Sequence, residues 1–121
     1  MKILFLTEGE EKIGFGHITR CIALCEAFEE KDINPALLVN GDNSILDLLR
    51  YKNFQRFDWI KNKEQLLPKI AQSDFIVIDS YLAEKSLYDK ISEVTDGKML
   101  MIDDYNRIDY PKGILVNPSI Y

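Results

Sequence analysis

The chain alternates between short apolar runs and longer segments in which apolar residues recur every three to four positions. Short runs rich in Ile, Leu, Val and Phe are typical of buried strands, and the three-to-four spacing is typical of amphipathic helices. The expected strands are residues 2–7, 35–40, 53–59, 75–78, 98–102 and 113–116, of which 53–59 is the weakest. The expected helices are residues 17 to about 31, 45–51, 64–71 and 84–94.

Strands that alternate with helices predict a parallel sheet with right-handed crossovers and helices on its faces. We therefore expect an α/β fold, with one Rossmann-like domain over residues 1–121 and the strand order 3-2-1-4-5-6. In such a sheet the order of the strands reverses between strands 1 and 4, so a ligand crevice opens beyond their carboxyl ends. This rule selects residues 7–17 and 79–81 as the segments of a candidate site.

The composition is that of an ordinary globular protein, with 46% hydrophobic and 29% charged residues. The formal net charge is -5 and no cluster of Lys and Arg occurs, which argues against nucleic-acid binding. The longest strongly apolar run, residues 3–6, is far shorter than a membrane span, and Met1-Lys2 leaves no room for a signal peptide. We expect a cytoplasmic protein that binds neither membranes nor nucleic acid.

Cys21 and Cys25 are the only cysteines and lie four positions apart in a helical pattern. They are expected to be reduced thiols that fill the core. With His17 they offer zinc-ligand chemistry, but the helical rise from His17 to Cys25 is ~12 Å, whereas two ligands of one zinc ion lie within ~4.5 Å of each other. The trio is therefore not expected to bind metal.

The segment Gly14-Phe15-Gly16-His17 opens the first helix. Its two glycines allow positive φ or a close approach of a ligand to the backbone, and a helix N-terminus offers unpaired N–H groups to an anion. The segment is not a dinucleotide fingerprint, because Thr19 stands where that motif needs its third glycine and the preceding loop is too long.

His17 is the only histidine of the chain and falls at the mouth of the expected crevice. A helix N-terminus disfavours imidazolium, so the ring should be neutral near pH 7, which is the form that a general base requires. The alternative is a histidine that only caps the helix or completes a hydrogen bond.

Arg20 lies one turn further along the same helix face, where it can meet a phosphate or carboxylate, or pair with a surface Glu. Asp79, Ser80 and Tyr81 follow the fourth strand. Asp79 can orient a substrate hydroxyl or His17, and Tyr81 can donate a hydrogen bond to a sugar. The alternative is that Asp79 or Ser80 caps the next helix while Tyr81 packs in the core.

Asp103 and Asp104 end the fifth strand, and with Asp79 they offer the oxygen ligands that magnesium prefers. Strand-end aspartates more often cap helices or hold loops, and adjacent side chains on an extended backbone point apart. We expect no metal site here, although one of the two carboxylates can face the crevice.

Four segments together resemble one family: residues 13–20, 78–81, 102–104 and 115–121, which read IGFGHITR, IDSY, IDD and LVNPSIY. Over its whole length the chain is similar to the UDP-sugar hydrolase of pseudaminic acid biosynthesis and to the related spore-coat polysaccharide biosynthesis proteins. The first segment is the most specific of the four.

The resemblance implies the N-terminal half of a two-domain glycosyltransferase B fold and a reaction that releases UDP from UDP-2,4-diacetamido-2,4,6-trideoxy-β-L-altropyranose by hydrolysis at the anomeric carbon. It implies that His17 is the general base and Tyr81 a second catalytic residue. No cofactor or metal is implied. The substrate-binding residues expected on both grounds are Gly14, Phe15, Gly16, Arg20, Asp79, Ser80 and Asp104.

Family members carry a second Rossmann-like domain that supplies most UDP contacts, and this chain departs from them in its length of 121 residues. The expected partners are therefore a UDP-sugar and a C-terminal domain or a separate chain. Two other functions stay open: the acceptor-side domain of a glycosyltransferase of the same fold, and a non-catalytic half that binds a partner through its C-terminal edge, at Ile114, Leu115, Ile120 and Tyr121.

Overall fold

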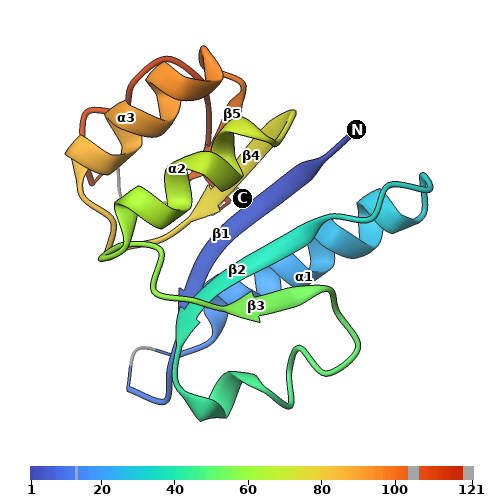
Figure 1. The fold of residues 1–121 in the computed structure, drawn as a ribbon. Coiled ribbons are helices and arrows are strands. Elements are labelled where there is room, and N and C mark those ends of the chain that lie inside the picture. The colour runs from blue at the N-terminus through green and yellow to red at the C-terminus, as the bar shows by residue number, and fades with distance from the viewer. Residues whose placement is uncertain (13, 104–106, 119–121) are drawn as a thin grey trace.

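The computed structural model describes residues 1–12, 14–103 and 107–118, and it is an α/β fold built on one parallel sheet (Figure 1). The strand order is β3-β2-β1-β4-β5-β6, as the sequence predicts, and all neighbouring strands are parallel. The strands are β1 (Ile3–Gly9), β2 (Ala36–Gly41), β3 (Phe54–Arg56), β4 (Phe75–Asp79), β5 (Met99–Ile102) and β6 (Ile114–Val116). The helices are α1 (Gly16–Glu29), α2 (Lys63–Ala71) and α3 (Lys85–Thr95), with a short 3-10 turn at Asn43–Ile45.

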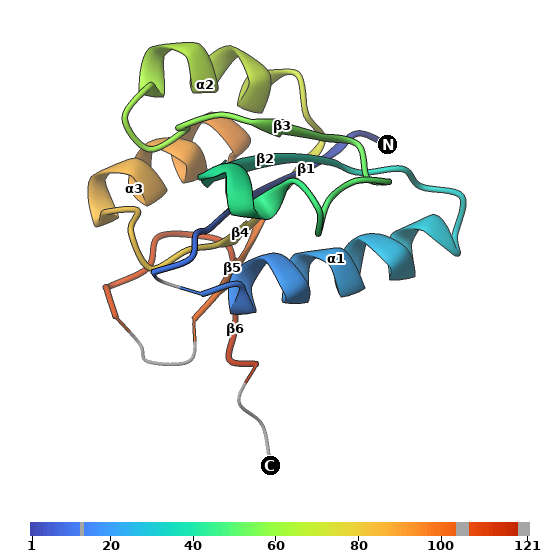
Figure 2. The ribbon, with the colours of Figure 1, turned by 90° about the horizontal axis from the view of Figure 1, so that it is seen from below.

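Helices cover both faces of the sheet, which is the arrangement of a Rossmann-like domain (Figure 2). Helix α1 lies against one face, and α2 and α3 lie together against the other. Each face has its own core: Phe5, Ile18 and Cys21 are buried on the α1 side, and Leu6 and Trp59 are buried on the α2 side. This double burial explains why the inner strands read as continuous apolar runs and show no alternation.

Helix α1 buries one stripe of its surface at Ile18, Cys21 and Cys25, in agreement with the predicted period. Both cysteines are reduced and buried, as expected from the sequence. Among the described residues every helix is too short or too polar to cross a lipid bilayer.

Strand β1 is longer than predicted, because it continues through Glu8 to Gly9 where a polar loop was expected. The parallel ladder with β2 extends to the pair Gly9 and Gly41, and all of β1 is buried. A Cβ atom on Gly9 would lie 2.3 Å from Cδ1 of Ile18. The glycine therefore permits the start of α1 to approach the end of β1.

The helix predicted at 45–51 is wrong, since only the 3-10 turn at Asn43–Ile45 forms, followed by irregular turns. Ile45 and Leu49 are fully buried, so the apolar spacing reflects two anchors of a short turn. A segment of this length gains few intrahelical hydrogen bonds for the cost of nucleation. The strand predicted at 53–59 shortens to β3, and Trp59 instead donates from Nε1 to the Thr7 carbonyl oxygen at 2.8 Å.

Candidate functional site

A small pocket of 230 Å³ opens beyond the carboxyl ends of β1 and β4, where the strand order predicts a ligand crevice. The residues that line it come from the end of β1, the first turns of α1 and the segment after β4. They are Glu8, Gly16, His17, Arg20, Tyr81 and Leu82. The structure thus brings together four residues that the sequence predicts for the site, namely Gly16, His17, Arg20 and Tyr81, with Asp79 directly beneath them.

Asp79 fixes the imidazole of His17. Nδ1 of His17 lies 2.5 Å from Oδ1 of Asp79, and the Asp79 side chain is fully buried while His17 is nearly so. A carboxylate accepts only, so the proton between them belongs to Nδ1, and in the corresponding neutral tautomer Nε2 carries the lone pair. Among the described residues no hydrogen bond to Nε2 is formed, and His17 lines the pocket.

Arg20 holds the same carboxylate from a second direction. Its Nε lies 2.7 Å from Oδ2 of Asp79 and its Nη2 lies 2.8 Å from Oδ1. This two-point pairing compensates a carboxylate that has no contact with solvent, and it leaves Asp79 with no freedom to rotate. Within the described part of the chain Arg20 therefore forms its ion pair with the buried Asp79, where a surface Glu was the alternative, and Arg20 also lines the pocket.

The ring of Tyr81 packs against the imidazole of His17. The ring centroids of His17 and Tyr81 are 4.4 Å apart with an interplanar angle of 88°, an edge-to-face contact. Tyr81 belongs to the segment between β4 and α3, so its position depends on how that segment is held.

Glu8 is a site residue that the sequence reasoning missed. It is 1% exposed, lines the pocket and accepts hydrogen bonds from Tyr81 N at 2.8 Å and Leu82 N at 3.1 Å, and from the hydroxyl of Ser80. The sequence carries a usable indication: Glu8 directly follows the apolar run of a buried strand and lies within the segment 7–17 beside the predicted crevice. The predicted strand 2–7 ends one residue before Glu8, so the prediction places Glu8 in the polar loop and does not name it as a site residue.

Ser80 and Phe15 lie near the site but serve the fold. Ser80 is fully buried, and its Oγ accepts from Leu82 N at 3.1 Å and Ala83 N at 3.0 Å, so it caps the backbone ahead of α3. Phe15 packs against the core on the α1 side. Neither is among the residues that line the pocket.

The two glycines of the Gly14-Phe15-Gly16 segment have different roles. Gly14 has a φ of +87°, a conformation that side chains disfavour, and its N donates to Glu10 O at 2.8 Å, which closes the loop after β1. A Cβ atom on Gly16 would meet nothing within 4 Å, since that position faces the pocket. Gly16 therefore leaves space for a ligand beside His17.

Asp103 holds a loop, as strand-end aspartates usually do. Its Oδ2 accepts from Arg107 N at 2.7 Å and from the hydroxyl of Tyr110. Asp104, predicted to bind substrate, lies outside the described residues, as do Ile120 and Tyr121. Within the described ranges no group of three or more His, Cys, Asp or Glu side chains has the geometry to hold a metal ion.

The thiols near the site are unreactive. Burial raises the pKa of the Cys21 thiol, and the charge of Asp79 raises it further. Burial likewise raises the pKa of Cys25 to about 12. A nucleophilic cysteine needs a lowered pKa, so neither is a candidate nucleophile.

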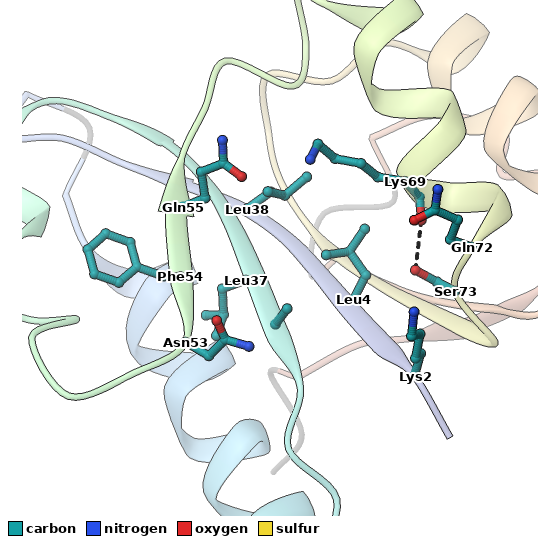
Figure 3. Close-up of a pocket in the computed structure, with 11 residues that line it drawn as sticks. Lys2, Leu4, Leu37, Leu38, Asn53, Phe54, Gln55, Lys69, Gln72 and Ser73 are labelled. Carbon is teal, nitrogen blue, oxygen red and sulfur yellow. Dashed lines mark hydrogen bonds between the residues drawn. The ribbon is translucent and has the colours of Figure 1, made fainter.

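A hollow of 330 Å³, larger than the pocket beside His17, lies at the opposite ends of the strands (Figure 3). It sits at the amino ends of β1, β2 and β3 beside the end of α2, and Leu4 and Leu38 form its floor. Its polar side chains carry ammonium, amide and hydroxyl groups, such as those of Lys69, Gln55 and Ser73. No imidazole or carboxylate lines it. We place the candidate site at the carboxyl edge, because a buried carboxylate, a guanidinium and an imidazole converge only there among the described residues.

In comparisons with known proteins, the sequence matches no family model and no curated protein.

Proposed function

We propose that this chain is the sugar-side domain of a UDP-sugar hydrolase, in which His17 activates the water that attacks the anomeric carbon. The observation that carries the proposal is the bond from His17 Nδ1 to the buried Asp79, which directs Nε2 to the pocket as a base. The four sequence segments that resemble the hydrolase of pseudaminic acid biosynthesis and the spore-coat polysaccharide proteins give the substrate class. In that reading the fold is the N-terminal half of a glycosyltransferase B enzyme of the cytoplasm.

The protein has two tasks in this reaction, which are to position the attacking water and to stabilise the charges that form. The water oxygen bonds to the anomeric carbon while its proton passes to Nε2 of His17, and the bond between that carbon and the diphosphate oxygen breaks with its electron pair leaving on UDP. Asp79 stabilises the imidazolium that forms, and Arg20 keeps the carboxylate in place. Diphosphate is already a good leaving group, so no metal or cofactor is required.

The pocket volume supports assigning only the sugar to this domain. At 230 Å³ it is smaller than the roughly 300–1,000 Å³ of pockets that enclose a drug-sized ligand. Gly16, Arg20 and Tyr81 border the space in which the sugar would lie, with Glu8 at its floor. The nucleotide would be held by a second domain, on the same chain or on a partner.

The only histidine of the chain provides a direct binding test. The imidazole Hε1 and Hδ2 signals of His17 should shift when UDP-2,4-diacetamido-2,4,6-trideoxyaltrose is added at millimolar concentration, and should shift far less with UDP alone. In the presence of a nucleotide-binding domain from the same enzyme class, UDP should be released and free sugar should form. An unmoved His17 spectrum with the sugar nucleotide, together with no release of UDP, would overturn the proposal.

The same assay separates the hydrolase from a glycosyltransferase. A transferase would release UDP only when a sugar or lipid acceptor is present, and the hexose would appear on that acceptor. The acidic net charge of -5 favours the hydrolase, because a membrane-associated transferase generally presents a basic face to anionic lipid.

A non-catalytic role is favoured by one feature at the far edge of the sheet. Ile114 and Leu115 of β6 are 56% and 46% exposed, so this edge strand presents apolar side chains to a partner. Light scattering after size-exclusion chromatography would show a stable complex if this edge binds another copy of the chain.

A further inference from the structure

We infer that Glu8 and Arg107 are positioning residues that hold the segment 80–83, and with it Tyr81, against His17. This inference rests on the proposed function only in giving Tyr81 a role in the reaction. The placement of Tyr81 by the two charged side chains is a matter of geometry and can be tested without substrate.

Glu8 binds the donors of the segment. Its Oε2 accepts from the N–H groups of Tyr81 and Leu82, and its Oε1 accepts from the hydroxyl of Ser80. The side chain is buried, and among the described residues no Lys or Arg pairs with it. A buried carboxylate is costly unless its oxygens are hydrogen-bonded, and these bonds to an anion are stronger than bonds between neutral groups. Glu8 therefore fixes the backbone at the position where Tyr81 begins.

Arg107 binds the acceptors of the same segment from the other side. Its Nη2 lies 2.8 Å from the Ala83 carbonyl oxygen and 3.3 Å from that of Ser80. Its own backbone N donates to Asp103, and its guanidinium lies 6.0 Å from the centroid of the Tyr88 ring. Among the described residues, Nε of Arg107 is the one buried side-chain nitrogen or oxygen without a hydrogen-bond partner. A buried unpaired N–H group costs free energy, so the contacts of Arg107 to the segment 80–83 are what hold this guanidinium in place.

Glu8 and Arg107 together supply hydrogen-bond partners to a segment that is neither helix nor strand. The segment lies after β4 and before α3, where neither a sheet nor a helix supplies partners for its backbone. Glu8 accepts from the N–H groups of Tyr81 and Leu82, and Arg107 donates to the carbonyl groups at the two ends of the segment, so both charged side chains supply partners to its backbone. The consequence is a fixed Tyr81 ring, 4.4 Å from the imidazole of His17.

The experiment is nuclear magnetic resonance on the 121-residue chain with the variants Glu8→Gln and Arg107→Met. Hydrogen exchange of the Tyr81 and Leu82 amides reports the hydrogen bonds directly. The chemical shifts of the His17 ring and the nuclear Overhauser contact between the two rings report the position of Tyr81. Tyr81→Leu gives the His17 shifts expected when the aromatic ring is absent, and Tyr81→Phe gives those of a ring without its hydroxyl.

We expect Glu8→Gln to accelerate exchange at Tyr81 and Leu82 by about 10- to 100-fold, the factor that corresponds to loss of charge-assisted hydrogen bonds. The His17 signals should move toward those of Tyr81→Leu, and Arg107→Met should move them in the same direction. Glu84→Gln and Arg50→Met are matched controls, because Glu84 makes no side-chain bond at the start of α3 and the exposed Arg50 contacts Asp47 and Tyr51, which are not site residues. Both controls should leave the His17 signals unchanged.

A purely structural role predicts a different result. In that case Glu8→Gln would lower the melting temperature but leave the His17 shifts and the ring contact as in the parent protein, which would overturn the inference. If Glu8→Gln does not fold, Glu8→Asp keeps the charge but shortens the side chain, and the same two outcomes then decide. Loss of hydrolysis in all UDP-sugar assays would refute the proposed function while leaving these spectroscopic results untouched.

Discussion

Nδ1 of His17 lies 2.5 Å from Oδ1 of Asp79, although 62 positions separate the two residues in the chain. Strands β1 and β4 are neighbours in the sheet, and Asp79 is in register with Thr7 at the end of β1. The Thr7 hydroxyl donates to the Asp79 carbonyl oxygen at 2.9 Å, which ties the two strand ends together. Helix α1 then begins above this pair, so its first turn places His17 over the carboxylate.

The first prediction concerns Asp79→Asn. The amide cannot hold Nδ1–H as a carboxylate does, so His17 loses the tautomer that leaves Nε2 as a base, and in a hydrolysing enzyme kcat should fall by up to about 10⁴-fold. The free energy of unfolding should also fall, by about 1–3 kcal/mol, because Arg20 loses its anion but remains partly solvated. UDP release and urea unfolding measure the two effects.

The exposed Asp89, paired with Lys85, provides the control. Asp89→Asn should change the free energy of unfolding by less than about 0.5 kcal/mol and leave the rate unaltered. Equal turnover in the Asp79 and Asp89 variants would show that the carboxylate under His17 has no part in the reaction.

The second prediction concerns His17→Ala. Loss of the base should lower kcat by about 10²- to 10⁴-fold while substrate affinity stays close to that of the parent enzyme. A His17 that only supports the fold would instead give a lower melting temperature with retained turnover, so both quantities are measured on the same variant. A fall in turnover of no more than about threefold with reduced stability would move the base to Asp79 or Tyr81.

The third prediction separates the roles of two glycines, Gly9 at the end of β1 and Gly16 at the start of α1. Gly9→Ala should lower the free energy of unfolding by about 1–3 kcal/mol, because its Cβ would lie 2.3 Å from Cδ1 of Ile18. Adding Ile18→Val removes that atom and should recover part of the loss. Gly16→Ala meets no neighbouring atom and should leave stability unchanged or slightly higher, yet weaken binding of the sugar nucleotide. Additive effects of the Gly9 and Ile18 substitutions would argue against the predicted clash.

The fourth prediction is a loss of stability in alkali. Burial raises the pKa of Cys25 from 9.0 to about 12, and it also raises the pKa values of Cys21, Tyr88 and Tyr110. The folded chain therefore keeps these protons at pH values where the unfolded chain has lost them. The stability they contribute is fully present below pH 9 and is lost as pH rises from 9 toward 12, at about 1.4 kcal/mol per pH unit for each fully titrating group.

Thermal melting between pH 7 and pH 11 measures this loss. Cys25→Val removes one titrating group and should make the decline shallower above pH 9. The exposed Tyr51 is a matched control, because Tyr51→Phe should leave the slope unchanged. A melting temperature that stays constant to pH 11 would contradict the prediction.

Much of the fold could be predicted from local pattern, because each inner strand is a continuous apolar run between polar turns. The strand order is that of the Rossmann-like sheet expected from the alternation of strands and helices, and it places His17 and Tyr81 beside one crevice. The segment after β2 was predicted incorrectly, since Ile45 and Leu49 have helical spacing but anchor a short turn. Both residues are spaced as in a helix because each packs into the core from the same short turn.

Some residues around the site could be predicted from the sequence and others could not. His17 and Tyr81 stand out in the sequence because one is the only imidazole, at the start of a helix, and the other follows a buried strand, and both fall beside the expected crevice. Glu8 and Arg107 do not, because an acidic or basic residue in a loop is usually solvated. Their role depends on which backbone groups lie unpaired beside them, and those groups belong to a segment more than twenty residues away in the chain.

The sequence by itself determined the α/β class, the order of the strands, the buried reduced cysteines and the end of the sheet at which chemistry would gather, because these depend on periodicity, chirality and residue type. Only the tertiary structure decided what Asp79 does. As a residue at a strand end it could cap a helix, bind a ligand or orient His17, and the choice depends on distances of a few ångströms between β4 and the first turn of α1. Hydrogen bonds are short and directional, so the partner of a buried carboxylate is set by the packing of elements that are distant in sequence.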